Sequence, residues 1–380
     1  MPALLDHVDP GGLEEFSVVF TDRSLNHMSQ AFQGVMRDIS ALLREVYAAE
    51  AVALVPGGGT CAMEAVARQF ATGRRAFVIR NGWFSYRWSQ ILDAGGIAAE
   101  TTVAMARSAG NSPVSAFAPA PIGEVTQAIR DARPEVVFAP HVETASGMIL
   151  PDDYLRALAE AAHGVGALFV LDCIASGCVW VDMTALGVDV LISAPQKGWS
   201  ASPSAGLVML SPTALARLEA TTSSSFALDL KKWRAVMAAY EGGGHAYHAT
   251  LPTDALRGFR DSMAETKSFG FARVAAAQWQ LGGAVRALLA ARGYPSVAAE
   301  GFGAPGVVVS FTDDPEIQNG RKFLTQGVQI AAGVPLQVGE PEGYRSFRIG
   351  LFGLDKLYDV EGTLARVTRA LDAVEAARGA

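Results

Sequence analysis

The sequence predicts an α/β fold in which helices cover a mostly parallel sheet, followed by a smaller C-terminal α+β unit. From about residue 50, short β-branched apolar runs alternate with longer segments of helical periodicity. This alternation is typical of parallel sheets built from βαβ units. Beyond about residue 255 it gives way to a long helical stretch and then to short strand-like runs, which indicates a second domain.

Six apolar runs are the predicted strands of the large sheet. They are residues 51–55, 75–80, 135–140, 167–172, 188–194 and 206–210. Helical periodicity fills the gaps, most clearly over residues 152–164, where Asp152 is the expected N-terminal cap and Gly164 the expected end. Residues 105–121 are rich in small residues and proline, so we expect a surface excursion there.

The C-terminal part is predicted to contain one helix from Thr253 to about Ala291, strands within GVVVSFT, VQIAAG and FRIGLFG, and a final helix to Glu375. A chain of 380 residues is long enough for two domains. We therefore divide it into an N-terminal segment (1–28), a large α/β domain (29–255) and a small α+β domain (256–380).

Composition excludes several classes of function. The chain has 31 basic and 38 acidic residues and a net charge of -7, so it lacks the basic footprint of a nucleic-acid-binding protein. No run reaches membrane-spanning length, and the N-terminus lacks the basic start of a secretory peptide. Cys61, Cys173 and Cys178 form no CxxC pair and, with His245 and His248, no zinc spacing. We therefore expect a cytoplasmic protein with reduced thiols and no metal.

An aspartate and a lysine each follow an apolar strand. Asp172 ends VLD, and Lys197 follows VLISAPQ. Both side chains should therefore project at the carboxyl edge of the sheet, where open α/β sheets bind ligands. A lysine that forms a Schiff base and an aspartate that keeps a pyridine nitrogen protonated are the two polar groups that pyridoxal phosphate requires. Taken alone, Asp172 is equally well explained as a cap on the following turn.

A glycine-rich turn follows the first predicted strand. In LVPGGGTCAMEA, Gly57, Gly58 and Gly59 allow the backbone to turn sharply. Thr60 then begins a helix whose free N–H groups can bind an anion. The turn therefore predicts a phosphate site.

The same stretch also fits the dinucleotide pattern GxGxxA, through Gly57, Gly59 and Ala62. A dinucleotide site should have an acid at the end of the second strand to bind the ribose hydroxyls. That strand ends instead in Arg80 and Asn81. The phosphate of a single cofactor is therefore the preferred interpretation.

Together these segments resemble the class V aminotransferases of the fold-type I pyridoxal-phosphate enzymes, most closely the alanine-glyoxylate and serine-pyruvate aminotransferase branch. The resemblance covers roughly residues 28–355. It implies that Gly58, Gly59 and Thr60 bind the cofactor phosphate. The segment NGWFSYR is similar to the family's NG-x-(aromatic)-x-x-R stretch, which implies that Phe84 stacks on the pyridine ring, with Trp83 as the second candidate.

Four further motifs of the family recur in the same order. HVETASG resembles the HxE(S/T)xxG loop, which makes Thr144 a partner of the ring hydroxyl. VLDCIAS matches the aspartate strand, which makes Asp172 the partner of the pyridine nitrogen. SAPQKGW resembles SxxQK, with Lys197 as the imine lysine and Gln196 beside the cofactor. FRIGLFG is similar to the RIG motif, so Arg348 is expected to bind the substrate carboxylate.

YHATLP resembles a family segment that reaches across a dimer to the neighbouring phosphate, and this implies that Tyr247 and Thr250 act in a homodimer with shared sites. Simpler roles remain open for several residues. Tyr247 and Thr250 could be turn residues, Phe84 a packing residue, Thr144 a helix cap, and Arg348 the partner of an acid between the domains. His141 and Glu143 are expected to position their loop.

The sequence departs from the family at two places. The family's GPGP-type N-terminal segment is replaced by residues 16–29, FSVVFTDRSLNHMS, and Trp199 stands where the family often has a smaller side chain. Both departures leave the identity of the substrate open, and we expect a differently shaped pocket.

Three functions fit this sequence. The leading one is a ping-pong transaminase that moves an amino group to a 2-oxo acid, with Lys197 as general base and acid. The second is a lyase that acts on an amino acid or aminophosphonate with the same cofactor, since the fold alone does not separate the two. A desulfurase is disfavoured because no cysteine lies beyond Cys178. The third is a catalytically silent scaffold, which should have lost a cofactor residue.

Overall fold

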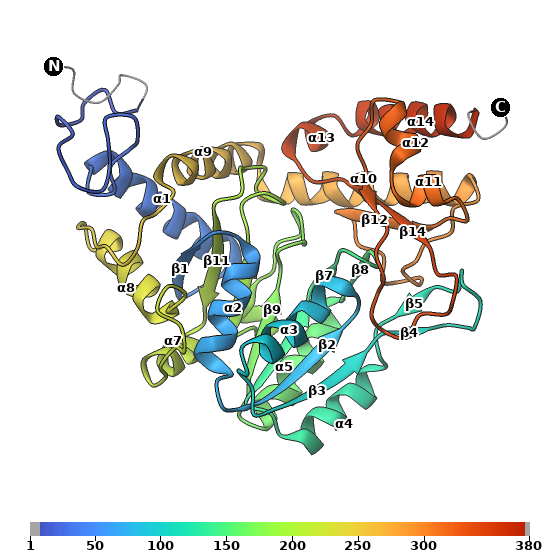
Figure 1. The fold of residues 1–380 in the computed structure, drawn as a ribbon, viewed down its shortest axis with the longest axis horizontal. Helices are drawn as coiled ribbons and strands as arrows, with labels where there is room; N and C mark the ends of the chain where they lie inside the picture. Colours follow the sequence, from blue (N-terminus) through green and yellow to red (C-terminus); the bar gives the residue numbers. More distant parts are fainter. Residues whose placement is uncertain (1–7, 377–380) are drawn as a thin grey trace.

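The structure is a computed structural model that describes residues 8–376. The predicted N-terminal segment therefore falls partly outside the described residues, at positions 1–7. Figure 1 shows a large sheet surrounded by helices and a smaller sheet beneath two long helices. None of the described helices has the length and apolarity needed to cross a membrane. The domain boundaries at residues 28 and 255 stay a prediction.

The large sheet has seven strands and confirms the predicted fold class. Its only antiparallel strand among the described residues is β11, which lies between β1 and β10, and the remaining strands run parallel. The strands lie in the order β1 (Ala51–Pro56), β11 (Ala205–Leu210), β10 (Val190–Ser193), β9 (Leu168–Asp172), β6 (Val136–Pro140), β2 (Arg75–Arg80) and β3 (Glu100–Met105).

All six predicted strands are present, but β3 was not predicted. Its sequence ETTVAM is polar at one end, and the strand lies at the edge of the sheet, where most of its residues are partly exposed. Residues 105–121 also contain more structure than expected. They form a short hairpin of β4 (Arg107–Ser108) and β5 (Phe117–Ala118), and the buried Phe117 bridges to Ala298.

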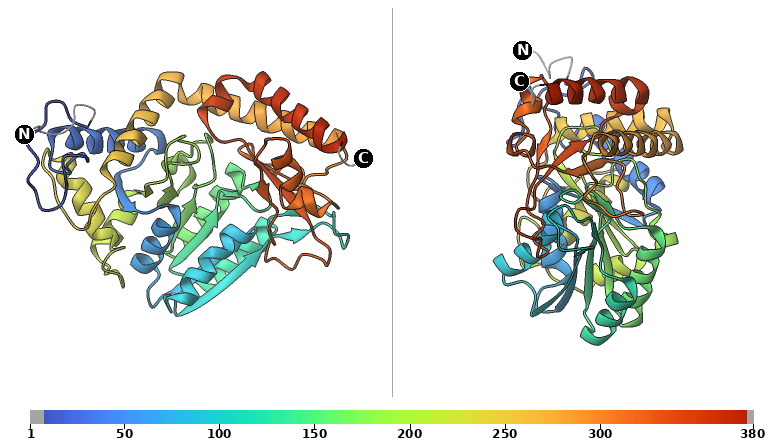
Figure 2. Two further views of the ribbon diagram at one scale, coloured as in Figure 1. Left: turned by 45° about the horizontal axis from the view of Figure 1, so that its top comes forward. Right: turned by 90° about the vertical axis from the view of Figure 1, so that its right-hand side faces the viewer.

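Helices lie on both sides of the large sheet in the right-hand view of Figure 2. Helix α5 has the predicted bounds, but Pro151 rather than Asp152 is its N-cap, and Gly164 is its last residue. Asp152 instead places its carboxylate in the first turn, where the helix dipole favours negative charge. The helices between residue 30 and residue 241 are α1 (Gln30–Tyr47), α2 (Gly59–Phe70), α3 (Trp83–Ala94), α4 (Ile122–Ala132), α5 (Asp152–Gly164), α6 (Met183–Leu186), α7 (Pro212–Glu219) and α8 (Leu230–Glu241).

The predicted long helix after Thr253 is wrong at one residue. Gly270 has φ +99° and divides it into α9 (Thr253–Phe269) and α10 (Phe271–Ala291). A residue with a Cβ rarely adopts this conformation, so glycine allows the chain to change direction here.

The small sheet is antiparallel, in the order β12 (Val307–Phe311), β14 (Ser346–Gly350) and β13 (Ala331–Ala332). Helices α10 and α14 pack against each other above it (Figure 1). The remaining short elements are β7 (Val142–Glu143), β8 (Met148–Ile149), α11 (Pro315–Gln318), α12 (Arg321–Thr325) and α13 (Leu354–Tyr358), and α14 spans Val360–Ala376.

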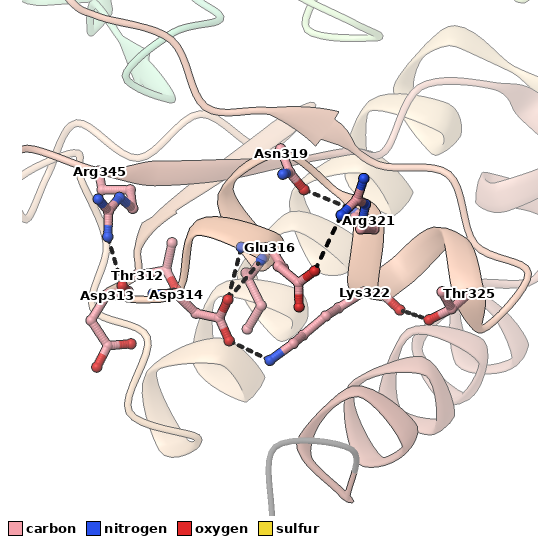
Figure 3. A network of polar contacts seen from close by, with 10 residues as sticks. Thr312, Asp313, Asp314, Glu316, Asn319, Arg321, Lys322, Thr325 and Arg345 are labelled. Carbon is pink, nitrogen blue, oxygen red and sulfur yellow. Dashed lines mark hydrogen bonds and ion pairs between the residues drawn. The ribbon is translucent and has the colours of Figure 1, made fainter.

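A polar network joins α11 to α12 beside the small sheet (Figure 3). The Asp314 carboxylate accepts hydrogen bonds from the backbone N–H groups of Glu316 and Ile317 at 2.8 and 3.3 Å, and pairs with Lys322 Nζ at 2.6 Å. Burial alone would raise the pKa of Asp314, but the Lys322 ammonium and these N–H donors lower it. The carboxylate therefore stabilises both helices while it is ionised.

We predict that Asp314→Ala lowers the free energy of unfolding by about 1–2 kcal/mol, because α11 loses its cap and Lys322 its partner. Asp314→Asn should cost less at neutral pH, since the amide oxygen can still cap. Because the folded pKa lies below the unfolded one, the advantage of wild type over Asp314→Asn should disappear as the pH falls below about 4. Denaturant unfolding of wild type and both variants at several pH values measures these differences. Equal stability of wild type and Asp314→Ala at pH 7 would contradict the prediction.

Candidate active site

A cavity of about 210 Å³ lies where β9 and β10 end, beside the N-termini of α2 and α3. The sequence predicted a ligand site at this edge of the sheet. The cavity is lined by Gly59, Thr60, Met63, Phe84, Arg87, Val142, Thr144, Asp172, Ile174, Ala175, Gln196 and Lys197. A larger hollow of about 860 Å³ is lined by residues between 9 and 33, and none of these described lining residues is a lysine or an arginine.

Asp172 is buried at the end of β9, and its carboxylate faces the cavity. One carboxylate oxygen accepts a hydrogen bond from the Ile174 N–H at 2.9 Å. Burial raises the pKa of Asp172 to about 7, against the opposing effect of this hydrogen bond. A cationic ligand group beside Asp172 would therefore stabilise the carboxylate and be stabilised by it.

Lys197 lies in the loop between β10 and β11, and its amine lies 4.9 Å from the centre of the Phe352 ring. Burial lowers the pKa of Lys197, and the positive charge of Arg348 lowers it further. More of the amine is therefore in the neutral, nucleophilic form than on an exposed lysine. The loop is tied to the region after β14, because the Leu354 N–H donates to Ser200 Oγ at 2.8 Å.

Close backbone packing fixes the loop that carries the lysine. A Cβ on Gly198 would lie 2.0 Å from the carbonyl oxygen of Gly177. Only glycine permits this approach. The backbone next to Lys197 is therefore held against the segment that follows Asp172.

The N-terminus of α2 forms one wall of the cavity. Gly58 is the N-cap, and a Cβ on Gly59 would lie only 2.4 Å from Ile174 Cδ1. Thr60 Oγ1 accepts a hydrogen bond from Arg87 Nη1 at 2.9 Å. This wall thus combines the start of a helix with a hydroxyl and a guanidinium, which together suit an anion.

Phe84 and Thr144 line the same cavity, and the carboxylate of Glu143 joins the two segments that carry them. Glu143 accepts hydrogen bonds from the backbone N–H groups of Phe84, Ser85 and Ala145. His141 is also buried, and its Nδ1 lies 2.7 Å from Ser176 Oγ. The positions of His141 and Glu143 agree with the expected structural role. The alternative of a cap role for Thr144 is not what the structure shows at α3, because Gly82 is the N-cap and the carboxylate that accepts from the first turn belongs to Glu143.

Arg348 projects from β14 toward the cavity, with its guanidinium carbon 5.4 Å from the centre of the Phe84 ring. Its Nε donates to the carbonyl oxygen of Ala332 at 2.8 Å. Burial lowers the pKa of Arg348, against the opposing charge of Glu143, but within residues 8–376 no carboxylate lies close enough to form an ion pair with Arg348. The guanidinium has donors left for a ligand.

Tyr247 and Thr250 lie outside this cavity. The Tyr247 hydroxyl and Thr250 Oγ1 are 3.0 Å apart, and the Tyr247 side chain is 54% exposed. The Tyr247 ring contacts His27, which belongs to the unusual N-terminal segment. One protomer therefore does not bring this pair to Lys197, and their role across a dimer stays a prediction.

Trp199 does not shape the pocket, contrary to expectation. Its side chain is 1% exposed and packs against Trp180, Tyr47 and Phe259 in the core.

Arg87 is a cavity residue that the sequence analysis did not identify. It ends the segment NGWFSYR, three residues after Phe84, so helical spacing on one face could have placed both at the cavity.

No three His, Cys, Asp or Glu side chains are grouped to hold a metal ion anywhere in the described part of the chain. All three cysteines are free, with Cys173 and Cys178 buried and Cys61 partly buried.

Comparison with known proteins places these features in a family. A family model described as aminotransferase class-V matches residues 15–333. The soluble hydrogenase small subunit of Synechococcus sp. (strain PCC 6716) is 28% identical over 93% of this chain and 88% of its own length. The L-aspartate–glyoxylate aminotransferase of Paracoccus denitrificans (strain Pd 1222) is 26% identical over 69% of this chain and 62% of its own length.

A solved structure shares the fold. The alanine–glyoxylate aminotransferase of Nostoc sp. superposes with a TM-score of 0.76 over 92% of this chain and 88% of its own, at 22% identity. The fold is thus that of the fold-type I aminotransferases, as predicted. Because the family model spans most of the sequence, including both Asp172 and Lys197, this chain belongs to the class-V aminotransferase family and is an amino-group-transferring enzyme.

Proposed function

We propose that this enzyme binds pyridoxal 5′-phosphate in the 210 Å³ cavity and moves an amino group from an amino acid to a 2-oxo acid. The observation that carries the proposal is that a buried carboxylate, Asp172, and a partly buried amine, Lys197, line one cavity. The cavity also has the chemistry of a cofactor site. Gln196 Oε1 is buried there without a hydrogen-bond partner. Burial raises the pKa of Asp172, and a pyridinium beside its carboxylate would lower that pKa again.

The lining residues divide between the parts of the cofactor. Asp172 would hold the pyridine nitrogen, Lys197 would carry the cofactor covalently, and Phe84 would stack on its ring. Thr144 would bind the ring hydroxyl, with Gln196 beside it. When bound, the cofactor supplies an electron sink for the negative charge that develops at the substrate Cα.

The phosphate would bind at the start of α2, at Gly58, Gly59 and Thr60. A helix N-terminus offers only about half a positive charge, whereas a phosphate monoester carries about -1.5 to -2 at neutral pH. Among the described residues that line the cavity, the two cations are Lys197 and Arg87. Since Lys197 is needed for the chemistry, we assign the missing charge to Arg87, which already contacts Thr60.

Arg348 and Lys197 would act on the substrate. The guanidinium of Arg348 can hold a carboxylate by two parallel hydrogen bonds, which orients the substrate Cα. The Lys197 amine, with its lowered pKa, can then take the Cα proton and return a proton to a neighbouring carbon. The lysine thus serves as both base and acid of the transfer.

The complete site would be shared by two subunits. Tyr247 and Thr250 are outside the cavity of their own subunit and carry two hydroxyls side by side on an exposed surface. In a homodimer these hydroxyls would bind the phosphate in the neighbouring site. A cytoplasmic location, expected from the sequence, also stays a prediction.

We predict that Lys197→Ala abolishes the half-reaction, because it removes both the attachment point and the base. A panel of amino acids is added to the cofactor-loaded protein, and the visible absorption and the 2-oxo product are followed. Wild type should respond to at least one donor, and Lys197→Ala to none, with a loss of at least about 10³-fold. Lys267→Ala is the control, since Lys267 pairs with Glu45 on the surface. No response of wild type to any donor would refute the proposal.

We predict a pH-dependent stability that depends on Asp172. The folded pKa of about 7 lies above the ordinary value of 3.8, so in the cofactor-free protein Asp172 lowers stability progressively as the pH rises from about 4 to about 7. Melting curves of wild type and Asp172→Asn should therefore diverge over this window, in favour of the variant. Added cofactor should reverse the difference near neutral pH. Parallel curves would contradict the buried-carboxylate explanation.

A shared site predicts complementation between subunits. We expect Lys197→Ala to be inactive alone and a Tyr247→Phe, Thr250→Ala double variant to be weakly active alone. The two variants are dissociated and reassociated together. If Tyr247 and Thr250 serve the neighbouring site, mixed dimers have one intact site, and about a quarter of the wild-type activity should return. If the residues serve their own subunit, no mixed dimer has an intact site and no activity returns.

A further inference from the structure

Glu143 is a buried carboxylate outside the residues assigned to the reaction. Its side chain is 1% exposed, and no lysine, arginine or histidine forms an ion pair with it within residues 8–376. A buried charge of this kind is costly unless hydrogen bonds replace its water. The hydrogen bonds that Glu143 accepts show which segments its carboxylate holds together.

Both oxygens of Glu143 are used. Oε1 accepts from the N–H groups of Phe84 at 3.2 Å and Ala145 at 2.9 Å. Oε2 accepts from the Ser85 N–H at 2.8 Å and the Ser85 hydroxyl at 2.6 Å. The carboxylate thus caps the first turn of α3 and, through Ala145, also holds its own loop.

The backbone is built to let this carboxylate approach. A Cβ on Gly82 would lie 2.7 Å from Glu143 Cγ and 2.8 Å from its carboxyl carbon. Any side chain at position 82 would push the carboxylate away from α3. The absence of a side chain at Gly82 therefore lets the Glu143 carboxylate reach the first turn of α3.

The two segments that Glu143 joins each carry one cavity residue. Phe84 is the second residue of α3, and Thr144 lies between Glu143 and Ala145. We propose that Glu143 is a positioning residue for the cofactor: it fixes the Phe84 ring relative to the Thr144 hydroxyl, so that ring stacking and the hydrogen bond to the ring hydroxyl are satisfied together. This inference rests on the proposed function and extends it to a residue that does not contact the cofactor.

Glu340 provides a matched control. Its carboxylate also accepts backbone hydrogen bonds, from Leu336, Gln337 and Val338 at 2.7, 3.2 and 3.1 Å, but it caps a loop outside the cavity. Loss of either carboxylate should destabilise a loop. Only Glu143 should affect how the cofactor is held.

The experiment compares Glu143→Gln with Glu340→Gln in the full-length protein. A glutamine has one carbonyl oxygen, so one oxygen position of Glu143 becomes an amide group that faces N–H donors. We expect Glu143→Gln to raise the dissociation constant of pyridoxal 5′-phosphate about tenfold and to weaken the visible circular dichroism of the bound cofactor. Glu340→Gln should lower Tm but leave both cofactor signals unchanged.

A second variant covers the case in which Glu143→Gln does not fold. Ser85→Ala removes the hydroxyl that donates to Oε2 and leaves the backbone donors to Glu143; it also removes the acceptor of the Asn81 and Gly82 N–H groups at the start of α3. Affinity for the cofactor should therefore fall by about two- to fivefold. The inference is overturned if the Glu143 and Ser85 variants that fold bind pyridoxal 5′-phosphate as wild type does, with an unchanged dichroism spectrum. Failure of wild type to bind the cofactor would instead refute the proposed function.

Discussion

A carboxylate held away from water at the end of a buried strand is the constraint on which this site depends. Asp172 ends β9 in the middle of the large sheet, where its charge is poorly solvated and only one backbone N–H of the following turn stabilises it directly. A charge in that place favours a cationic ligand group. Lys197 lies near enough to help neutralise it but has its own pKa lowered by burial and by Arg348. The same shielding from water therefore prepares an acceptor for a cation and a reactive amine.

Close packing fixes the segments around Asp172 relative to one another. Ile174, which binds the Asp172 carboxylate through its N–H, also approaches Gly59 so closely that no side chain fits there. Gly198 packs on Gly177 with a similar lack of space. The N-terminus of α2 and the lysine loop are thus both fixed relative to the segment that follows β9. Protein interiors transmit displacements because they are close-packed, so these three parts move little relative to one another.

Much of the fold and the cavity could be predicted because strand ends and glycine turns are local signals. Asp172, Lys197 and Gly59 follow apolar runs directly, and parallel strands bring such positions to one edge. Features set by tertiary contacts were not predictable. The edge position of β3 allows a partly polar sequence to form a strand. Trp199 is buried in the core rather than exposed in the cavity, and this depends on contacts that form only when the chain folds. Helical spacing after Phe84 could have placed Arg87 at the cavity, but its contact with Thr60 at the start of α2 depends on how the two helices pack.

The hydrogen bond between Leu354 and Ser200 has a mechanical consequence. It connects the loop that carries Lys197, beside the large sheet, to the chain that follows β14, the strand of Arg348 in the small sheet. A rotation that carries Arg348 toward a carboxylate must either break this bond or pull the lysine loop with it. While the bond holds, the positions of the lysine loop and of the chain that follows β14 are coupled, although the two belong to different sheets.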